Sequence, residues 1–290
     1  MNTAHAPTEP QRPVFTPDPS LSGLSFIGVV RSELAKLLAL RTTYWLSAIT
    51  LGLSLLIAGS VAWSLSQWSE GESQAMLAES AMAGMYFALL LLGALAVICM
   101  TTEFTTGAIR SSMTAVPRRS MLYLGKALAL TILIAVVTAV LIIACHVLAV
   151  LLGGELELTA PFTDSDVAYI YLTHWIAVVL TGLLGFGLGA LLRSSAGGIV
   201  VLTVIVFVLQ VVFTIILGVS DGADWAVALA QSDFSYLITQ FTSPPSETSV
   251  DAMEFLGLGT LELWQSTLGL VIWTAVPFVL GWVTFQRRDV

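Results

Sequence analysis

Long apolar stretches separated by short polar segments dominate the pattern along the chain. A helix needs about 20 mostly apolar residues to cross the hydrocarbon core of a bilayer. The pattern therefore predicts an all-α integral membrane protein with six transmembrane helices at Tyr44–Leu65, Ala81–Thr101, Met121–Leu152, Ala168–Leu192, Ala196–Val219 and Thr267–Phe285. The third stretch is long enough for a helix of about 48 Å, so we expect it to tilt or to project from the membrane. Only three residues separate the fourth and fifth stretches, which predicts a tight hairpin.

The segment before the first apolar stretch divides into two parts. Residues 1–22 are rich in proline and predict a disordered cytoplasmic tail. Residues 23–41 predict an amphipathic interfacial helix, with apolar residues at three- and four-residue spacing; these are Phe26, Ile27, Val30, Leu34, Leu37 and Leu38. Basic side chains lie off this apolar face, and Glu33 is expected to pair with Lys36 on the helix surface. Residues 42–290 then form a single six-span transmembrane domain.

Composition supports a membrane protein. The chain is 57% hydrophobic and only 10% charged, with a mean hydropathy of +0.90. Soluble domains carry about 25% charged residues. A water-soluble core could not hide this much apolar surface, so a soluble fold is excluded.

The distribution of charge predicts the orientation. Ten of the eleven Lys and Arg residues lie before the first stretch, between the second and third, between the fourth and fifth, or after the sixth, and the eleventh, Lys126, lies near the start of the third. Fourteen of the nineteen acidic residues lie on the opposite side. Because basic residues collect on the cytoplasmic side, we expect a multi-pass protein of the bacterial cytoplasmic membrane with both termini in the cytoplasm.

The segment between the second and third stretches carries more charge than a simple connection needs. Residues 103–115 predict a short helix that follows the second span with little break, with Ile109 and Met113 forming a small apolar face. Pro117 ends it, because the residue before proline disfavours helical geometry. Membrane topology alone accounts for the basic residues that follow, Lys126 among them. The segment is either a basic cytoplasmic loop whose charges only reflect the positive-inside rule or a docking helix for a cytoplasmic protein.

Two stretches of this chain resemble segments of ABC-2 type transporter permeases. They are RSELAKLLALRTTYWL, before the first span, and TEFTTGAIRSSMTAVPRRSMLYLGKAL, after the second. Ala108 and Met113 stand where Thr and Leu are common in that family. The resemblance implies a permease subunit with an N-terminal elbow helix, a short coupling helix between spans two and three, and outer re-entrant or interfacial helices between spans five and six. The implied ATPase-coupling residues are Glu103, Phe104, Gly107, Ile109, Arg110 and Met113, and the implied elbow-helix residues are Arg31, Glu33, Lys36 and Arg41.

The resemblance also implies the partners. The Gly125-Lys126 pair lacks the other residues of a phosphate-binding loop, so we expect no cofactor in this chain and Mg-ATP on separate ABC ATPase subunits. A second permease copy or a related permease, and membrane lipids, complete the expected partners, without nucleic acid. The expected function is export of a hydrophobic, lipid, peptide or drug-like substrate. The alternative is a stand-alone membrane transporter or membrane scaffold protein with no ATPase partner.

Several polar and aromatic residues are candidates for a transport pathway or gate. Polar groups inside a membrane are costly and often functional. The candidates are His146, Gln210, Trp225, Phe234 and Phe241, although a histidine packed within the bundle is the alternative for His146.

The glycine-rich stretch 181–192 predicts close helix packing, either within the subunit or between two copies. A G-x-S-x-G pattern at Gly218–Gly222 ends an apolar helix, which disfavours a hydrolase.

Overall fold

The computed structural model describes residues 25–68, 73–116, 118–153, 158–244 and 258–287, and every long element in these ranges is a helix. Six of the described helical segments are long and apolar enough to cross a membrane: Arg41–Gln67, Gln74–Thr105, Arg119–Leu152, Ser165–Leu192, Ser195–Val219 and Leu263–Arg287. The six-span prediction is therefore confirmed. The predicted tail, residues 1–22, lies outside the described residues.

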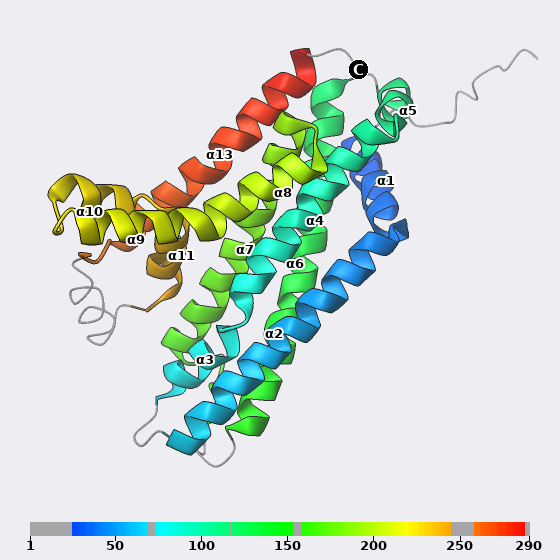
Figure 1. The fold of residues 1–290 in the computed structure, drawn as a ribbon. Coiled ribbons are helices and arrows are strands. Elements are labelled where there is room, and N and C mark those ends of the chain that lie inside the picture. Colours follow the sequence, from blue (N-terminus) through cyan, green and yellow to red (C-terminus); the bar gives the residue numbers. More distant parts are fainter. Residues whose placement is uncertain (1–24, 69–72, 117, 154–157, 245–257, 288–290) are drawn as a thin grey trace, which may run out of the picture.

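The helices follow one another as Figure 1 shows. Their bounds are α1 Phe26–Ala39, α2 Arg41–Trp68, α3 Gln74–Met82, α4 Met85–Thr105, α5 Ala108–Ala115, α6 Arg119–Leu152, α7 Ser165–Leu192, α8 Ser195–Thr203, the π-helical turn η2 Val204–Val208, α9 Leu209–Val219, α10 Asp224–Gln231, α11 Phe234–Thr242 and α13 Leu263–Arg287. The third span is the longest at 34 residues, as predicted. The fourth and fifth spans meet in the expected tight hairpin at Arg193 and Ser194.

The second span begins earlier than predicted and is broken near its start. A turn at Ala83 and Gly84 separates α3 from α4. The glycine is required by close packing, because a Cβ at Gly84 would lie 2.5 Å from the Ser54 carbonyl oxygen. The Ser54 hydroxyl also donates a 3.0 Å hydrogen bond to the Gly84 carbonyl, which ties α2 to the break.

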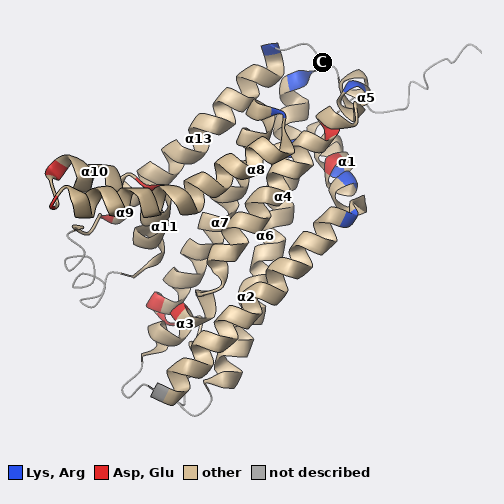
Figure 2. Cartoon of the chain, in the orientation of Figure 1, with Lys and Arg blue, Asp and Glu red and all other residues tan. Residues whose placement is uncertain are grey.

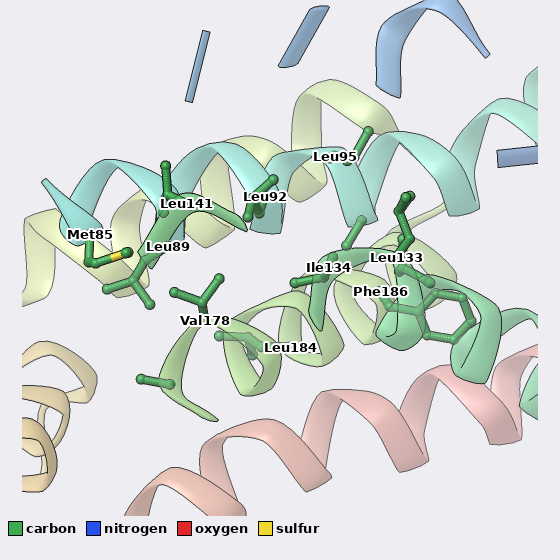
Figure 3. Packing of buried hydrophobic residues seen from close by; sticks show 14 of the residues in the cluster. Met85, Leu89, Leu92, Leu95, Leu133, Ile134, Leu141, Val178, Leu184 and Phe186 are labelled. Atoms are coloured by element: carbon green, nitrogen blue, oxygen red, sulfur yellow. The ribbon is translucent and has the colours of Figure 1, made fainter. Parts of the chain in front are cut away.

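The core lies between α4, α6 and α7 (Figure 3). Leucine, isoleucine and valine side chains from the three helices interdigitate there, including Leu92, Ile134 and Val178. The glycines of α7 allow close contact: a Cβ at Gly185 would lie 2.3 Å from the Gly93 carbonyl oxygen of α4. The glycine-rich stretch is thus a seam within the subunit, which settles the alternative left open by the sequence.

The remaining long helices surround this core more loosely. α13 crosses α7 so closely that a Cβ at Gly187 would lie 2.5 Å from the Phe278 backbone nitrogen. The fifth span, α8–η2–α9, diverges from the other helices and carries α10 and α11 beside its far end (Figure 1). Little of α2, of the fifth span or of α13 is buried inside the chain.

Charge is segregated along the bundle (Figure 2). The described Lys and Arg residues gather at one end, around α1, α5, the start of α6, the α7–α8 hairpin and the end of α13. We call this the basic end. Most described acidic residues lie away from this end: Glu79 on α3, Asp164 and Asp166 at the start of α7, and Asp221, Asp224, Asp233 and Glu262 around α10 and the start of α13. This separation is the observation on which the predicted orientation depends.

Two local features at the basic end differ in detail from the predictions. The short helix predicted over residues 103–115 covers only Ala108–Ala115, because α4 runs to Thr105 and Gly107 has φ 72°, the left-handed conformation that glycine adopts without strain. The face of α1 that packs against the other helices is a different one from the apolar face predicted for the membrane interface. Its buried residues are Val29, Glu33 and Leu37, whereas Ile27 is 79% exposed.

Candidate functional site

A cluster of ion pairs at the basic end joins helices that are distant in sequence. The ammonium nitrogen Nζ of Lys126 on α6 lies 2.5 Å from Oε2 of Glu33 on α1 and 2.5 Å from Oε1 of Glu103 on α4. Nζ of Lys36 lies 2.7 Å from Oε1 of Glu33 and 3.6 Å from Oε1 of Glu103. We call Glu33, Lys36, Glu103 and Lys126 the ion-pair cluster. Its two acids and two bases balance in charge.

The cluster is largely enclosed by protein. The side chains of Lys126 and Glu33 are 5% and 4% exposed, and that of Glu103 is 14% exposed. Lys36 forms the open edge, with 47% of its side chain exposed. Since removing one partner of a buried ion pair leaves an uncompensated charge, the four residues depend on one another.

Backbone packing explains how Glu33 reaches Lys126. Glu33 shares a helix face with Val29 and Leu37, at four-residue spacing on either side, and this face is buried. α1 approaches α6 at Gly125, where a Cβ would lie 2.7 Å from a methyl carbon of Val29. The Gly125-Lys126 pair thus has a structural explanation: the glycine admits α1, and the lysine binds its carboxylate.

The surroundings keep the α1 side of the cluster ionised. Burial alone would raise the pKa of Glu33, but the Lys126 charge and hydrogen bonds from Lys126 and Lys36 outweigh it, so the pKa lies below the ordinary 4.5. Burial alone would lower the pKa of Lys36, but its hydrogen bond to Glu33 and the Glu103 charge raise the pKa above the ordinary 10.5. Both groups therefore carry charge at neutral pH.

The cluster also holds the short helix α5. Lys36 Nζ donates a 3.0 Å hydrogen bond to the Ser112 hydroxyl of α5. Ile109 is fully buried and Ser112 is buried beside it, whereas Arg110, Ser111 and Thr114 are exposed. α5 therefore has one face fixed to the bundle and one face open at the basic end.

The predicted coupling residues divide between these two faces. Of the predicted set, Ile109 is buried and Met113 is partly buried, and Arg110 and Gly107 are exposed. Glu103 belongs to the ion-pair cluster. The structure thus brings the predicted residues into one region, with Arg110 on the exposed face of α5.

Phe104 extends the same region toward the other helices. Its ring lies 4.7 Å from the guanidinium carbon of Arg193, at the α7–α8 hairpin, a favourable cation–π distance. The ring of Phe285, on α13, meets Phe104 edge to face at 6.3 Å. The end of α4 is therefore in contact with α13 and with the turn between spans four and five, as well as with the ion-pair cluster.

The predicted elbow residues have two kinds of environment. Arg31 and Arg41 are exposed, as expected of basic residues outside the apolar face. Glu33 and Lys36 pair as predicted. Glu33 is also buried and binds Lys126, which the prediction did not include. Membrane topology likewise explains only part of the placement of Lys126, because this residue also forms ion pairs with Glu33 and Glu103.

The predicted pathway and gate residues do not come together. His146 Nδ1 lies 2.9 Å from the Tyr171 hydroxyl, so it has a hydrogen-bond partner within the bundle. Phe234 and Phe241 are buried core residues, and Trp225 is 62% exposed. Gln210 lines a cavity beside α11. No single site in the described residues contains this set.

Sequence reasoning missed three site residues. Lys126 lies within an apolar run and next to a glycine, and a charge at such a position is a signal that it has a partner. Ser112 carried no signal. Asp233, in the connection between spans five and six, is 1% exposed, but nothing in the sequence separates it from the neighbouring acids.

Two properties describe the chemistry of the basic end. The ion-pair cluster has its charges matched, although Glu103 Oε2 is buried without a hydrogen-bond partner. Among the described residues, no group of three or more His, Cys, Asp or Glu side chains could hold a metal. The arrangement is therefore suited to fastening helices together and presenting α5, more than to catalysis.

Comparison with known proteins identifies the family. The sequence profile described as ABC-2 family transporter protein matches residues 64–290, more than three quarters of the chain. The match begins within α2, so α1 precedes it. A comparison with curated proteins gives no match. With six helices long and apolar enough to span a membrane in the part described, the chain is a multi-pass membrane protein that belongs to the ABC-2 transporter family.

Proposed function

We propose that this chain is the permease subunit of an exporter driven by ATP hydrolysis on separate ATPase subunits, which would bind Mg-ATP. The observation that carries the proposal is α5. It is a short helix with an exposed face, it lies at the basic end, and a buried ion-pair cluster fastens it to the transmembrane helices. A loop that only joined two spans would not need this attachment.

The exposed face of α5 is the proposed contact with the ATPase. It presents Arg110, Ser111 and Thr114, while Ile109 and Ser112 hold the helix from behind. A guanidinium is well suited to pair with carboxylates of a partner protein. Gly107 gives α5 its direction, because the backbone turns there at φ 72° between α4 and α5.

The ion-pair cluster is the proposed route by which force on α5 reaches the spans. Ser112 connects α5 to Lys36, and Lys36 and Lys126 connect α1, α4 and α6 through the two carboxylates. A displacement of α5 would then move these helices as a unit. Alternating access of a central pathway follows if the unit pivots against the rest of the bundle.

Orientation and assembly belong to the same proposal. Placing the basic end in the cytoplasm of a bacterium follows the positive-inside rule and puts α5 where an ATPase can reach it. α1 would act as an elbow helix at the membrane surface, and α10 and α11 as outer helices that cover the exit. A second permease copy is proposed because α2, the fifth span and α13 are little buried within the chain. A hydrophobic, lipid, peptide or drug-like substrate would pass between the copies.

Co-purification with ABC ATPase subunits from the source organism tests the proposal. The wild-type complex is expected to survive detergent solubilisation. Arg110→Glu reverses the charge on the exposed face of α5 and should abolish co-purification while leaving the melting temperature unchanged. Arg41→Glu, an equal charge reversal at an exposed residue of α2, serves as the matched control and should retain the ATPase. Transport that continues without ATP and without the ATPase would support a stand-alone transporter instead.

A further inference from the structure

A small cavity lies between the fifth span and the helices that follow it. Its volume is about 120 Å³, and its lining includes Gln210, Phe213 and Leu217 of α9 and Asp233 and Tyr236 at the start of α11. A buried water needs roughly 10–15 Å³ measured in this way. The cavity therefore has room for a small organic group.

Asp233 lines this cavity, and one oxygen of its carboxylate has no hydrogen-bond partner. The side chain is buried, and its Oδ2 accepts hydrogen bonds from the backbone nitrogens of Ser235 (3.0 Å) and Tyr236 (3.1 Å), which caps α11. Its other oxygen, Oδ1, is buried with no hydrogen-bond partner. An N-cap needs only one oxygen. Capping therefore accounts for the contacts of Oδ2 and leaves Oδ1 without a partner.

Among the described residues, no ion pair brings a positive charge to Asp233. The chain has no Lys, Arg or His between residues 194 and 286, and Asp233 is the charged residue of the cavity lining. Burial raises the pKa of Asp233, although backbone hydrogen bonds at the start of α11 counter this. A buried carboxylate without a counter-ion is unfavourable, and a cation from outside would relieve it.

The neighbouring groups define which cation fits. The Tyr236 hydroxyl already donates to the Gly259 carbonyl, and the Thr214 hydroxyl donates to the Gln210 carbonyl. The Gln210 side-chain amide remains as a second polar group, and the Phe213 and Tyr236 rings offer faces that favour an organic cation. Calcium prefers six to eight oxygen ligands, and the described residues hold no group of three or more acidic, histidine or cysteine side chains.

We propose that this cavity binds the ammonium group of an amine-bearing amphiphile, with Asp233 as its counter-ion. The ammonium pairs with the Asp233 carboxylate in the cavity wall, and the apolar body of the ligand packs against Phe213 and Leu217. The proposal rests on the proposed transport function in one respect, that the bound amine is a substrate or a substrate-like ligand. The binding site itself requires no ATPase.

A binding experiment on the full chain in phosphatidylcholine nanodiscs, without ATPase, tests the site. The probes are 4-fluorobenzylamine and its uncharged counterpart 4-fluorobenzyl alcohol, followed by ¹⁹F line broadening with empty nanodiscs as the blank. The amine is expected to bind the wild-type chain more tightly than the alcohol. Equal broadening by both probes would overturn the proposal and needs no variant.

Matched variants locate the charge. Asp233→Asn keeps a side-chain oxygen for the α11 cap and should weaken amine binding about tenfold or more, the usual effect of removing a charge-assisted hydrogen bond, with alcohol binding unchanged. Asp221→Asn removes the same charge nearby, at φ 49°, which asparagine tolerates, and should bind like wild type. Amine binding that survives Asp233→Asn, or is lost equally in Asp221→Asn, would refute the site. These binding results do not depend on the proposed ATPase contact. A failed co-purification would count against that contact and not against this site.

Discussion

Removal of the Lys126 charge is the sharpest test of the ion-pair cluster. Lys126→Met retains most of the apolar stem and deletes the ammonium that lies 2.5 Å from both Glu33 and Glu103. Two carboxylates would then share Lys36 alone. Breaking a buried ion pair by removing one partner costs about 3–5 kcal/mol. We expect the lower end of this range, because Glu103 and Lys36 retain some solvent contact.

The expected change is measurable as thermal stability. A loss of about 3 kcal/mol in the free energy of unfolding corresponds to a fall of roughly 6–12 °C in melting temperature for a chain of this size. Size-exclusion chromatography of heated, detergent-solubilised protein gives that temperature. Arg118→Met removes the same charge at an exposed residue just before α6, and it should change the free energy by no more than about 0.5 kcal/mol.

A double variant separates charge from packing. Lys126→Met leaves two carboxylates to share Lys36. Glu103→Gln combined with Lys126→Met removes the charge of one of them, so the double variant should melt above Lys126→Met alone. The account fails if Lys126→Met melts within a degree of wild type, or if Arg118→Met is equally damaging. A double variant that is less stable than Lys126→Met would show that the lost stability does not come from unpaired charge.

Three further predictions concern stability and the basic end. Gly185→Ala, whose Cβ would lie 2.3 Å from the Gly93 carbonyl oxygen, should lower the melting temperature and the yield of folded protein, whereas Gly52→Ala, with open space around it, should not. Gly107→Ala should cost about 1 kcal/mol by forcing alanine to φ 72° and should weaken ATPase co-purification. The folded-state pKa of Glu33 lies below 4.5, so its pairing stabilises fully above pH 4.5 and is lost as the pH falls through that lower pKa. Melting temperatures measured from pH 7 to pH 3 should therefore fall less steeply for Glu33→Gln than for wild type; parallel curves would contradict this.

The sequence was informative wherever local composition decides structure. Long apolar runs were sufficient to predict all six spans, because a helix that crosses the bilayer needs about 20 mostly apolar residues in one continuous stretch. The tight hairpin at Arg193 and the end of α5 before Pro117 follow from local geometry. The start of α5 was less well predicted: the short helix begins at Ala108, directly after Gly107, and not at residue 103.

Pairing across the fold could not be predicted in the same way. Glu33 and Lys126 are 93 residues apart and meet only because Gly125 admits α1 against α6. The pair of Glu33 and Lys36 was the local expectation, and Glu33 makes the tertiary contact with Lys126 in addition, through its other oxygen. The unpartnered oxygen of Asp233 is equally invisible in sequence, because it depends on which groups α9 and α11 bring to the cavity.

Site-specific photocrosslinking tests the central claim most directly. A benzophenone side chain at Ser111, on the exposed face of α5, is predicted to crosslink to the ATPase in assembled complexes. The same probe at Asp221, an exposed residue at the far end of the fifth span, should give no ATPase adduct. A crosslink from Asp221 and none from Ser111 would contradict both the proposed orientation and the role of α5.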